Sequence, residues 1–485
     1  MISNLANSSS EKTGAPEDFF SPAEIDLSCR QPVLSLFTKA IAWLAVGSLL
    51  ALLTSIKLHA PTILADHSWS TFGRLQSAAQ TIFLYGFGSQ AGLGIALWLL
   101  ARLGRTKLVQ PGFITLAVIF WNLGVALGVI GILAGDSTGF VGLEIPRYAS
   151  PILFFSYLLI GLCALLTFAA RRERILYPSQ WFLFAALFIF PWIFSTASLL
   201  LVFHPVRGIF QAAVNFWFIH NFQTLWLGSI GIAAIFYFIP KIMGRPLYSH
   251  YLAGFSFWLL LIFGGWGGIP AYAPLPAWMS SLSTVTNIVM LVTIFSLAMN
   301  WYFSFSNGHK SEENLPLRFI KFGAICYLLY CFIRVGTALH SVSQGTQFTH
   351  FDTALSQLGL YGFFAMTIFG AIYFIVPRLT NIEWPSATLG KTHYWCSAFG
   401  IALMVIALGL GGILQGRALG DARVEFIKTV KITIPFIGMS TLGGLLLLIG
   451  HSALLWNLSV MLSRYCRLHF RPKTLFETKM SGGNA

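Results

Sequence analysis

The chain has 485 residues, of which 56% are hydrophobic and 9% are charged, and its formal net charge is +14. A water-soluble protein cannot bury so large an apolar fraction, so we expect an all-α integral membrane protein. The positive charge falls in clusters after every second apolar segment, and this placement excludes the nucleic-acid partner that the net charge alone suggests.

Residues 1–33 are rich in Ser, Asn, Glu and Pro and are predicted to form a disordered cytoplasmic tail without a cleavable signal sequence. About twelve apolar segments of roughly 20 residues follow, each long enough to cross a bilayer as a helix. They start near residues 34, 72, 112, 151, 179, 208, 249, 280, 316, 350, 392 and 430. We therefore predict one twelve-helix domain over residues 34–465 and a cytoplasmic tail over residues 466–485.

Lysine and arginine cluster at residues 102–107, 171–174, 241–245, 310–321, 378–391 and 464–473. The opposite loops carry few basic residues, apart from Arg147, Arg207 and residues 417–431. This distribution predicts a multi-pass protein of a bacterial-type cytoplasmic membrane with both termini in the cytoplasm. The six cysteines form neither CxxC nor CxxCH, so we expect no covalently attached c-type haem.

Several motifs occur in a fixed order along the chain. They are G-R-L (Gly73–Leu75), W-F-I-H-N-F (Trp217–Phe222), Y-F-I-P-K-I-M-G-R-P (Tyr237–Pro246), F-W-L-L-L-I-F-G-G-W (Phe257–Trp266), L-P-A-W (Leu275–Trp278) and Y-G-F-F-A-M-T-I-F-G-A-I-Y-F-I-V-P-R-L (Tyr361–Leu379). Their order resembles subunit I of cbb3-type cytochrome c oxidases, the C family of haem-copper oxidases. The resemblance implies a twelve-helix subunit of a respiratory complex that binds two b-type haems and one copper ion and reduces oxygen while pumping protons.

The resemblance implies histidine ligands, because neutral imidazole suits both haem iron and copper. The tenth helix should carry H-x-H, whose members point to opposite sides of a helix because they are turned by about 200°. In register, these positions hold Leu355 and Gln357, and the remaining axial ligand of the low-spin haem falls at Ala79. Leucine and alanine have no lone pair, and a carboxamide binds iron poorly.

The copper site implied by the resemblance has three histidines, of which only His220 is present. The other two should lie before L-P-x-W, where Gly267–Pro274 contains no histidine. The family's tyrosine and arginine positions hold Gly264 and Ser440. Because metal sites need three or four ligands, we interpret His220 as a hydrogen-bonded polar residue rather than as a copper ligand. We predict no cofactor and no catalytic residue.

Other polar residues lie inside the predicted membrane helices. Ser356 and Gln357 either form hydrogen bonds in the cavity that a haem would fill or join neighbouring helices. Arg334 either pairs with Asp352 across two helices or extends toward the outer interface, and the second arrangement is favoured.

Three functions agree with this sequence. The favoured one is a metal-free, catalytically silent pseudoenzyme that scaffolds a respiratory-type membrane complex, in contact with lipid and other membrane subunits. A second is an active terminal oxidase with haem b and copper that takes electrons from cytochrome c. The third is a protein that binds or transports a small molecule or ion through the haem cavity. Whether the chain is an enzyme stays open.

Overall fold

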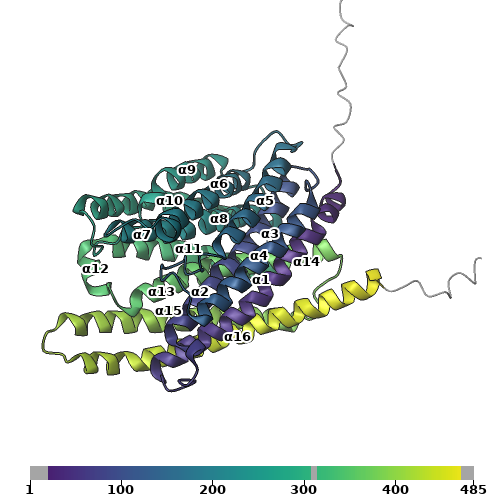
Figure 1. Cartoon of the computed structure of the whole chain (residues 1–485). Helices are drawn as coiled ribbons and strands as arrows, with labels where there is room; N and C mark the ends of the chain where they lie inside the picture. Colours follow the sequence, from purple (N-terminus) through teal and green to yellow (C-terminus); the bar gives the residue numbers. More distant parts are fainter. Residues whose placement is uncertain (1–19, 307–313, 471–485) are drawn as a thin grey trace, which may run out of the picture.

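The computed structural model describes residues 20–306 and 314–470, which fold into a bundle of helices (Figure 1). In chain order the α-helices are α1 (Pro22–His59), α2 (Phe72–Thr81), α3 (Ser89–Leu103), α4 (Pro111–Ala134), α5 (Ser150–Ala169), α6 (Pro178–Ser198), α7 (Phe210–Asn221), α8 (Gly228–Met243), α9 (His250–Phe263), α10 (Ala277–Ser306), α11 (Leu315–Ala338), α12 (His340–Thr346), α13 (His350–Gln357), α14 (Met366–Thr380), α15 (Ala387–Gly420) and α16 (Phe426–Phe470).

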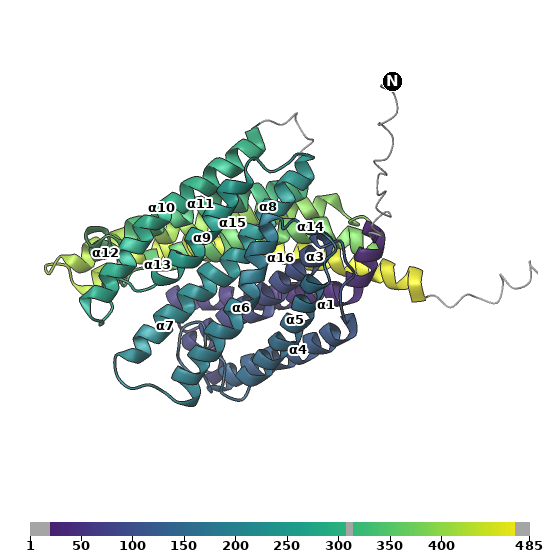
Figure 2. The same cartoon turned by 90° about the horizontal axis from the view of Figure 1, so that it is seen from above.

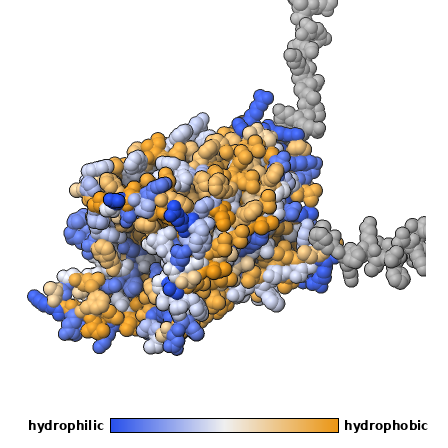
Figure 3. Space-filling model, in the orientation of Figure 1, coloured by the Kyte–Doolittle hydropathy of each residue, from blue (hydrophilic) through white to orange (hydrophobic). Residues whose placement is uncertain are grey.

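Eleven continuous helical segments within the described ranges are long and apolar enough to cross a membrane. The twelfth expected segment, near residue 249, is the shorter apolar helix His250–Trp266, so the count of twelve is not confirmed by length. Hydrophobic side chains cover much of the flank of the bundle, and hydrophilic ones gather toward its two ends (Figure 3). The protein is an integral, multi-pass membrane protein.

The first helix begins earlier than the sequence analysis placed it. Ser21 and Glu24 form a capping box, in which the Ser21 Oγ accepts from the Glu24 amide at 3.3 Å and the Glu24 carboxylate accepts from the Ser21 amide at 2.9 Å. Pro22 occupies the first helical position, where its missing N–H costs nothing. Residues 22–33 of the expected tail are therefore helical, and residues 1–19 lie outside the described part.

The three most buried spans occupy the centre of the bundle. They are Phe72–Leu103, Phe210–Met243 and His350–Thr380, with 100%, 89% and 89% of their most apolar stretch buried, against 28–50% for the other spans. These spans carry Ala79, His220 and the pair Leu355 and Gln357, so the expected ligand positions share one interior. The antiparallel pair α15 and α16 lies at the edge and projects past α12 (Figures 1 and 2).

Each central span contains a π-helical segment directly after its expected ligand position. These segments are η2 (Ile82–Gly88), η4 (Phe222–Leu227) and η6 (Leu358–Ala365). A π turn inserts one extra residue into an α-helix and is most frequent at functional sites. The backbone therefore has an unusual geometry at three of the four places where the sequence resemblance expects metal ligands, and a fourth π segment, η3 (Leu199–Phe203), follows α6, where none is expected.

Candidate functional site

His220 lies at the C-terminal end of α7 and is 6% exposed. Its Nε2 is 2.7 Å from the Gly264 carbonyl oxygen, and its Nδ1 is 2.8 Å from an Nη of Arg334. A carbonyl only accepts and a guanidinium only donates, so Nε2 carries the proton and Nδ1 accepts. His220 is thus a neutral imidazole with both nitrogens engaged, as the hydrogen-bonded interpretation predicted.

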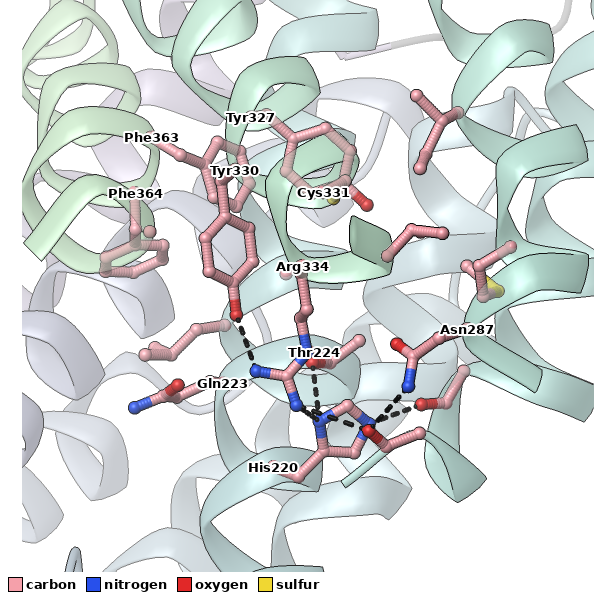
Figure 4. Close-up of a pocket in the computed structure, with 18 of the residues that line it drawn as sticks. His220, Gln223, Thr224, Asn287, Tyr327, Tyr330, Cys331, Arg334, Phe363 and Phe364 are labelled. Atoms are coloured by element: carbon pink, nitrogen blue, oxygen red, sulfur yellow. Dashed lines mark hydrogen bonds between the residues drawn. The ribbon is translucent and has the colours of Figure 1, made fainter. Parts of the chain in front are cut away.

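Arg334 reaches this histidine from α11, on the opposite side of the site (Figure 4). Its guanidinium also donates to the Gly267 carbonyl at 3.3 Å and approaches the Tyr330 hydroxyl at 3.5 Å. The expectation that this side chain extends to the outer interface was therefore wrong. Hydrogen bonds from its Nη2 atom to a neutral imidazole and a backbone carbonyl hold the charged head inside the bundle.

Asp352 is not the partner of Arg334. Among the described residues, no nitrogen–oxygen contact within 4 Å joins the two side chains, and the Asp352 side chain is solvent-exposed near the start of α13. Both residues nevertheless line one cavity of about 240 Å³. The proposed charge pair is thus absent, although the two charges share the same aqueous space.

Two adjoining cavities meet at His220 and Arg334. The wider one is also lined by Leu355 and Ser356, so the first expected haem-ligand position faces His220 across open space. The smaller one, of about 50 Å³, extends among apolar side chains. Its apolar lining includes Leu227, Met290, Ile294, Phe363 and Phe364.

The region between the expected low-spin haem ligands is packed with aromatic rings. Phe83 of η2 and Tyr361 of η6 have ring centroids 4.4 Å apart, and each lies four residues after Ala79 and Gln357, respectively. Oε1 of Gln357 is buried and has no hydrogen-bond partner within the described part of the chain, so this atom does not join helices. Ser356 lines the wider cavity, and whether it forms hydrogen bonds there stays a prediction.

The residues at this centre do not fit a copper ion or a haem. Copper needs a lone pair from each imidazole ligand, and both nitrogens of His220 already form hydrogen bonds. The Arg334 guanidinium, a fixed positive charge, lies against the nitrogen that would face a metal. Within residues 20–306 and 314–470, no group of three or more His, Cys, Asp or Glu side chains is placed to hold a metal ion.

A second pair of buried histidines was not foreseen. His393 of α15 and His451 of α16 have ring centroids 5.9 Å apart, and both are 0% exposed. Nδ1 of His451 is 2.7 Å from the Ser48 Oγ, and Nδ1 of His393 is 3.2 Å from the Tyr373 hydroxyl. Neither Nε2 has a partner in the described structure. The available signal was an imidazole within each of two apolar segments, which is costly in lipid.

The chain matches the family model for cytochrome c and quinol oxidase polypeptide I over residues 31–446. The chain belongs to this family. A cytochrome c oxidase subunit 1 homologue of Azorhizobium caulinodans is 26% identical over 446 residues, which cover 88% of this chain and 80% of that protein. The cbb3-type cytochrome c oxidase subunit CcoN1 of Stutzerimonas stutzeri is 25% identical over 437 residues, which cover 86% and 91%.

A solved haem-copper terminal oxidase dimer has the same fold, with a TM-score of 0.72 and 14% sequence identity. The superposition covers 90% of this chain and 84% of the oxidase chain. The resemblance to cbb3-type subunit I that the motifs indicated is therefore confirmed at the level of family and fold.

Proposed function

We propose that this member of the polypeptide I family is a metal-free, catalytically silent subunit that scaffolds a respiratory-type membrane complex. The observation that carries the proposal is the hydrogen bond from Arg334 to Nδ1 of His220. A guanidinium and a metal cation on the same imidazole would lie within a few ångströms of each other and would repel each other.

The haem positions support the same proposal. Leu355 and Ala79 offer no electron pair to iron, and Phe83 and Tyr361 pack together one turn further along their helices. Burial of these rings stabilises the contact between the two central spans that a haem would otherwise bridge. The fold is thus held together by packing where related proteins named as oxidases would hold a cofactor.

The helical bundle and its exposed apolar flank also support a scaffolding role. The complete bundle is present, and large apolar side chains such as Phe155, Trp192 and Trp258 are exposed on its flank. Such surfaces contact lipid or the helices of other subunits. The first turn of α1 and the last turn of α16 lie at the same end of the bundle (Figure 2). This placement supports a topology with both termini in the cytoplasm and α9 as a twelfth crossing.

The test is a reduced-minus-oxidised visible spectrum of the purified protein with iron and copper analysis of the same sample. We expect no b-type haem bands and less than about one metal ion per ten chains. A matched sample with the Arg334→Gln substitution should also stay metal-free, because one imidazole is too few ligands. Sharp haem bands with stoichiometric iron would instead establish the active-oxidase alternative.

The partner subunits are tested separately, by purifying the tagged chain from its membrane in a mild detergent. We expect other integral membrane proteins to co-purify in fixed stoichiometry. Recovery of the chain alone, from membranes in which it is abundant, would contradict the scaffold role and leave the metal-free site intact.

A further inference from the structure

Arg334 has hydrogen-bond donors to spare. A guanidinium has five N–H groups, and the structure gives three contacts, to Nδ1 of His220, the Gly267 carbonyl and the Tyr330 hydroxyl. The Nε atom is buried and has no partner among the described residues. All three acceptors are neutral, so the charge of Arg334 is solvated but not neutralised by its direct contacts.

The wider cavity brings water-accessible space to this cation. Its volume of about 240 Å³ exceeds that of several water molecules, each of which takes about 30 Å³. Hydroxyl and amide groups dominate the polar part of its lining. They belong to Gln223, Ser283, Thr284, Asn287, Ser343 and Gln347. A small polar solute can therefore exchange its hydration for hydrogen bonds beside Arg334.

The charges around the cavity favour an anion at its inner end. Arg334 supplies the positive charge there, and His220 is neutral because its Nδ1 accepts from the guanidinium. The carboxylate that lines the cavity, Asp352, is exposed and lies beyond ion-pair distance from Arg334. An anion on Arg334 would thus be attracted by the cation and weakly repelled by Asp352.

We propose that this cavity binds a short-chain monocarboxylate such as acetate or propionate, with its carboxylate on the Arg334 guanidinium. One oxygen would accept from the spare N–H of Nη1, and the other would take over the long 3.3 Å contact that Nη2 makes with the Gly267 carbonyl, so that the planar fork binds both oxygens while the bond to His220 is kept. The smaller apolar cavity of about 50 Å³, which opens at the same arginine, accepts the methyl or ethyl tail and limits its length. This inference rests on the metal-free centre of the proposed function, because a copper ion would displace the guanidinium.

Acetate binding is measured from the unfolding midpoint of the purified protein, followed by tryptophan fluorescence. Sodium acetate and sodium propionate are titrated against sodium chloride at equal ionic strength. We expect saturable stabilisation with a Kd of about 1 mM, as suits a ligand of four or five heavy atoms. Chloride should not reproduce it, because a single atom cannot accept from both arms of the fork.

Chain length distinguishes a free short acid from a fatty acid of the bilayer. Butyrate should bind more weakly than propionate, and octanoate more weakly still, because the apolar cavity is small. Tighter binding of octanoate would assign the site to fatty acids and overturn the short-chain proposal.

Two substitutions have opposite predicted effects. Arg334→Gln should abolish the acetate response, whereas Asp352→Asn should strengthen binding about threefold by removing the like charge. Arg334→Lys keeps the positive charge but not the planar fork of donors, so it should weaken acetate binding about tenfold. This variant tests the proposal even if Arg334→Gln does not fold. An unchanged response in Arg334→Lys, or weaker binding in Asp352→Asn, would overturn the proposal.

Metal analysis of the same samples separates this inference from the proposed function. If the protein is metal-free but acetate does not stabilise it, the proposed function still holds and the anion site is disproved. Stoichiometric copper or iron would instead remove the premise on which both depend.

Discussion

His220 and the pair His393 and His451 are all buried between membrane helices, but their surroundings differ. Both nitrogens of His220 are bonded, one of them to a cation. His393 and His451 each use Nδ1 only, and their Nε2 atoms have no partner within the described residues. The comparison shows that the histidine at the expected copper-ligand position has both nitrogens engaged, whereas the two histidines outside the expected ligand positions each have an unpartnered Nε2 within the described residues.

The difference has energetic consequences, because hydrogen bonds to charged groups are worth more than neutral ones. A typical neutral bond contributes about 1 kcal/mol, and one to a charged group about 1.5–3 kcal/mol. The His220 and Arg334 contact should therefore be part of what stabilises the bundle. At His393 and His451, the folded state already bears the free-energy cost of burying two Nε2 atoms without hydrogen-bond partners.

The largest effect is expected from His220→Leu, which leaves the Arg334 guanidinium without its closest acceptor. We expect the free energy of unfolding in detergent to fall by about 2–3 kcal/mol, the order expected when a partly buried charged group loses a hydrogen bond. His220→Gln, which can still present an oxygen to Arg334, is the matched control and should lose less. Equal stability of the Leu variant and the parent protein would show that the contact does not stabilise the fold.

The double variant His220→Leu with Arg334→Leu should be more stable than the sum of the two single changes predicts. Both partners are then apolar, so no buried charge is left without an acceptor. We expect a coupling energy of about 2 kcal/mol from a double-mutant cycle of unfolding measurements. Strict additivity would mean that the two side chains do not interact.

The single change Arg334→Leu should cost less than His220→Leu, about 1–2 kcal/mol. It removes the cation itself and leaves only a neutral Nδ1 without a donor. The unfolding midpoint under the same conditions is the measurement. If Arg334→Leu lowered the free energy of unfolding by more than His220→Leu does, then His220 would depend on Arg334 more than Arg334 depends on His220, contrary to our prediction.

The smallest effect is expected from His451→Phe, with a change in unfolding free energy of less than about 1 kcal/mol. The ring volume is nearly kept, and Ser48 retains its 2.7 Å bond to the Leu44 carbonyl. His220→Phe serves as the control at the other site, where the same substitution should be clearly destabilising. Comparable losses at both sites would remove the distinction between them.

The sequence allowed most of the fold to be predicted, because hydropathy and helix length act locally. Eleven of the expected segments are long helices that begin within a few residues of the predicted starts, apart from α1. The early start of α1 could have been predicted from S-P-A-E at residues 21–24, because this capping sequence starts a helix even where the surrounding composition is polar. The family also followed from the sequence.

The contacts inside the site could not be predicted in the same way. His220 and Arg334 are 114 positions apart, and their meeting depends on how α7 and α11 face each other. The same holds for His393 and His451, on the two arms of the α15 and α16 pair. Each π turn also rotates the following residues relative to an α-helix, so side-chain direction beyond η4 and η6 does not follow from spacing alone.

The π turns have a consequence for how such a protein can change over generations. A single substitution is enough to change a side chain such as Leu355 or Ala79. An inserted residue is lost only by a deletion, which would turn the rest of the helix by about 100° and shift it by about 1.5 Å. Such a deletion would misplace an entire buried face at once. A helix irregularity of this kind is therefore much harder to remove by mutation than the identity of any single side chain beside it.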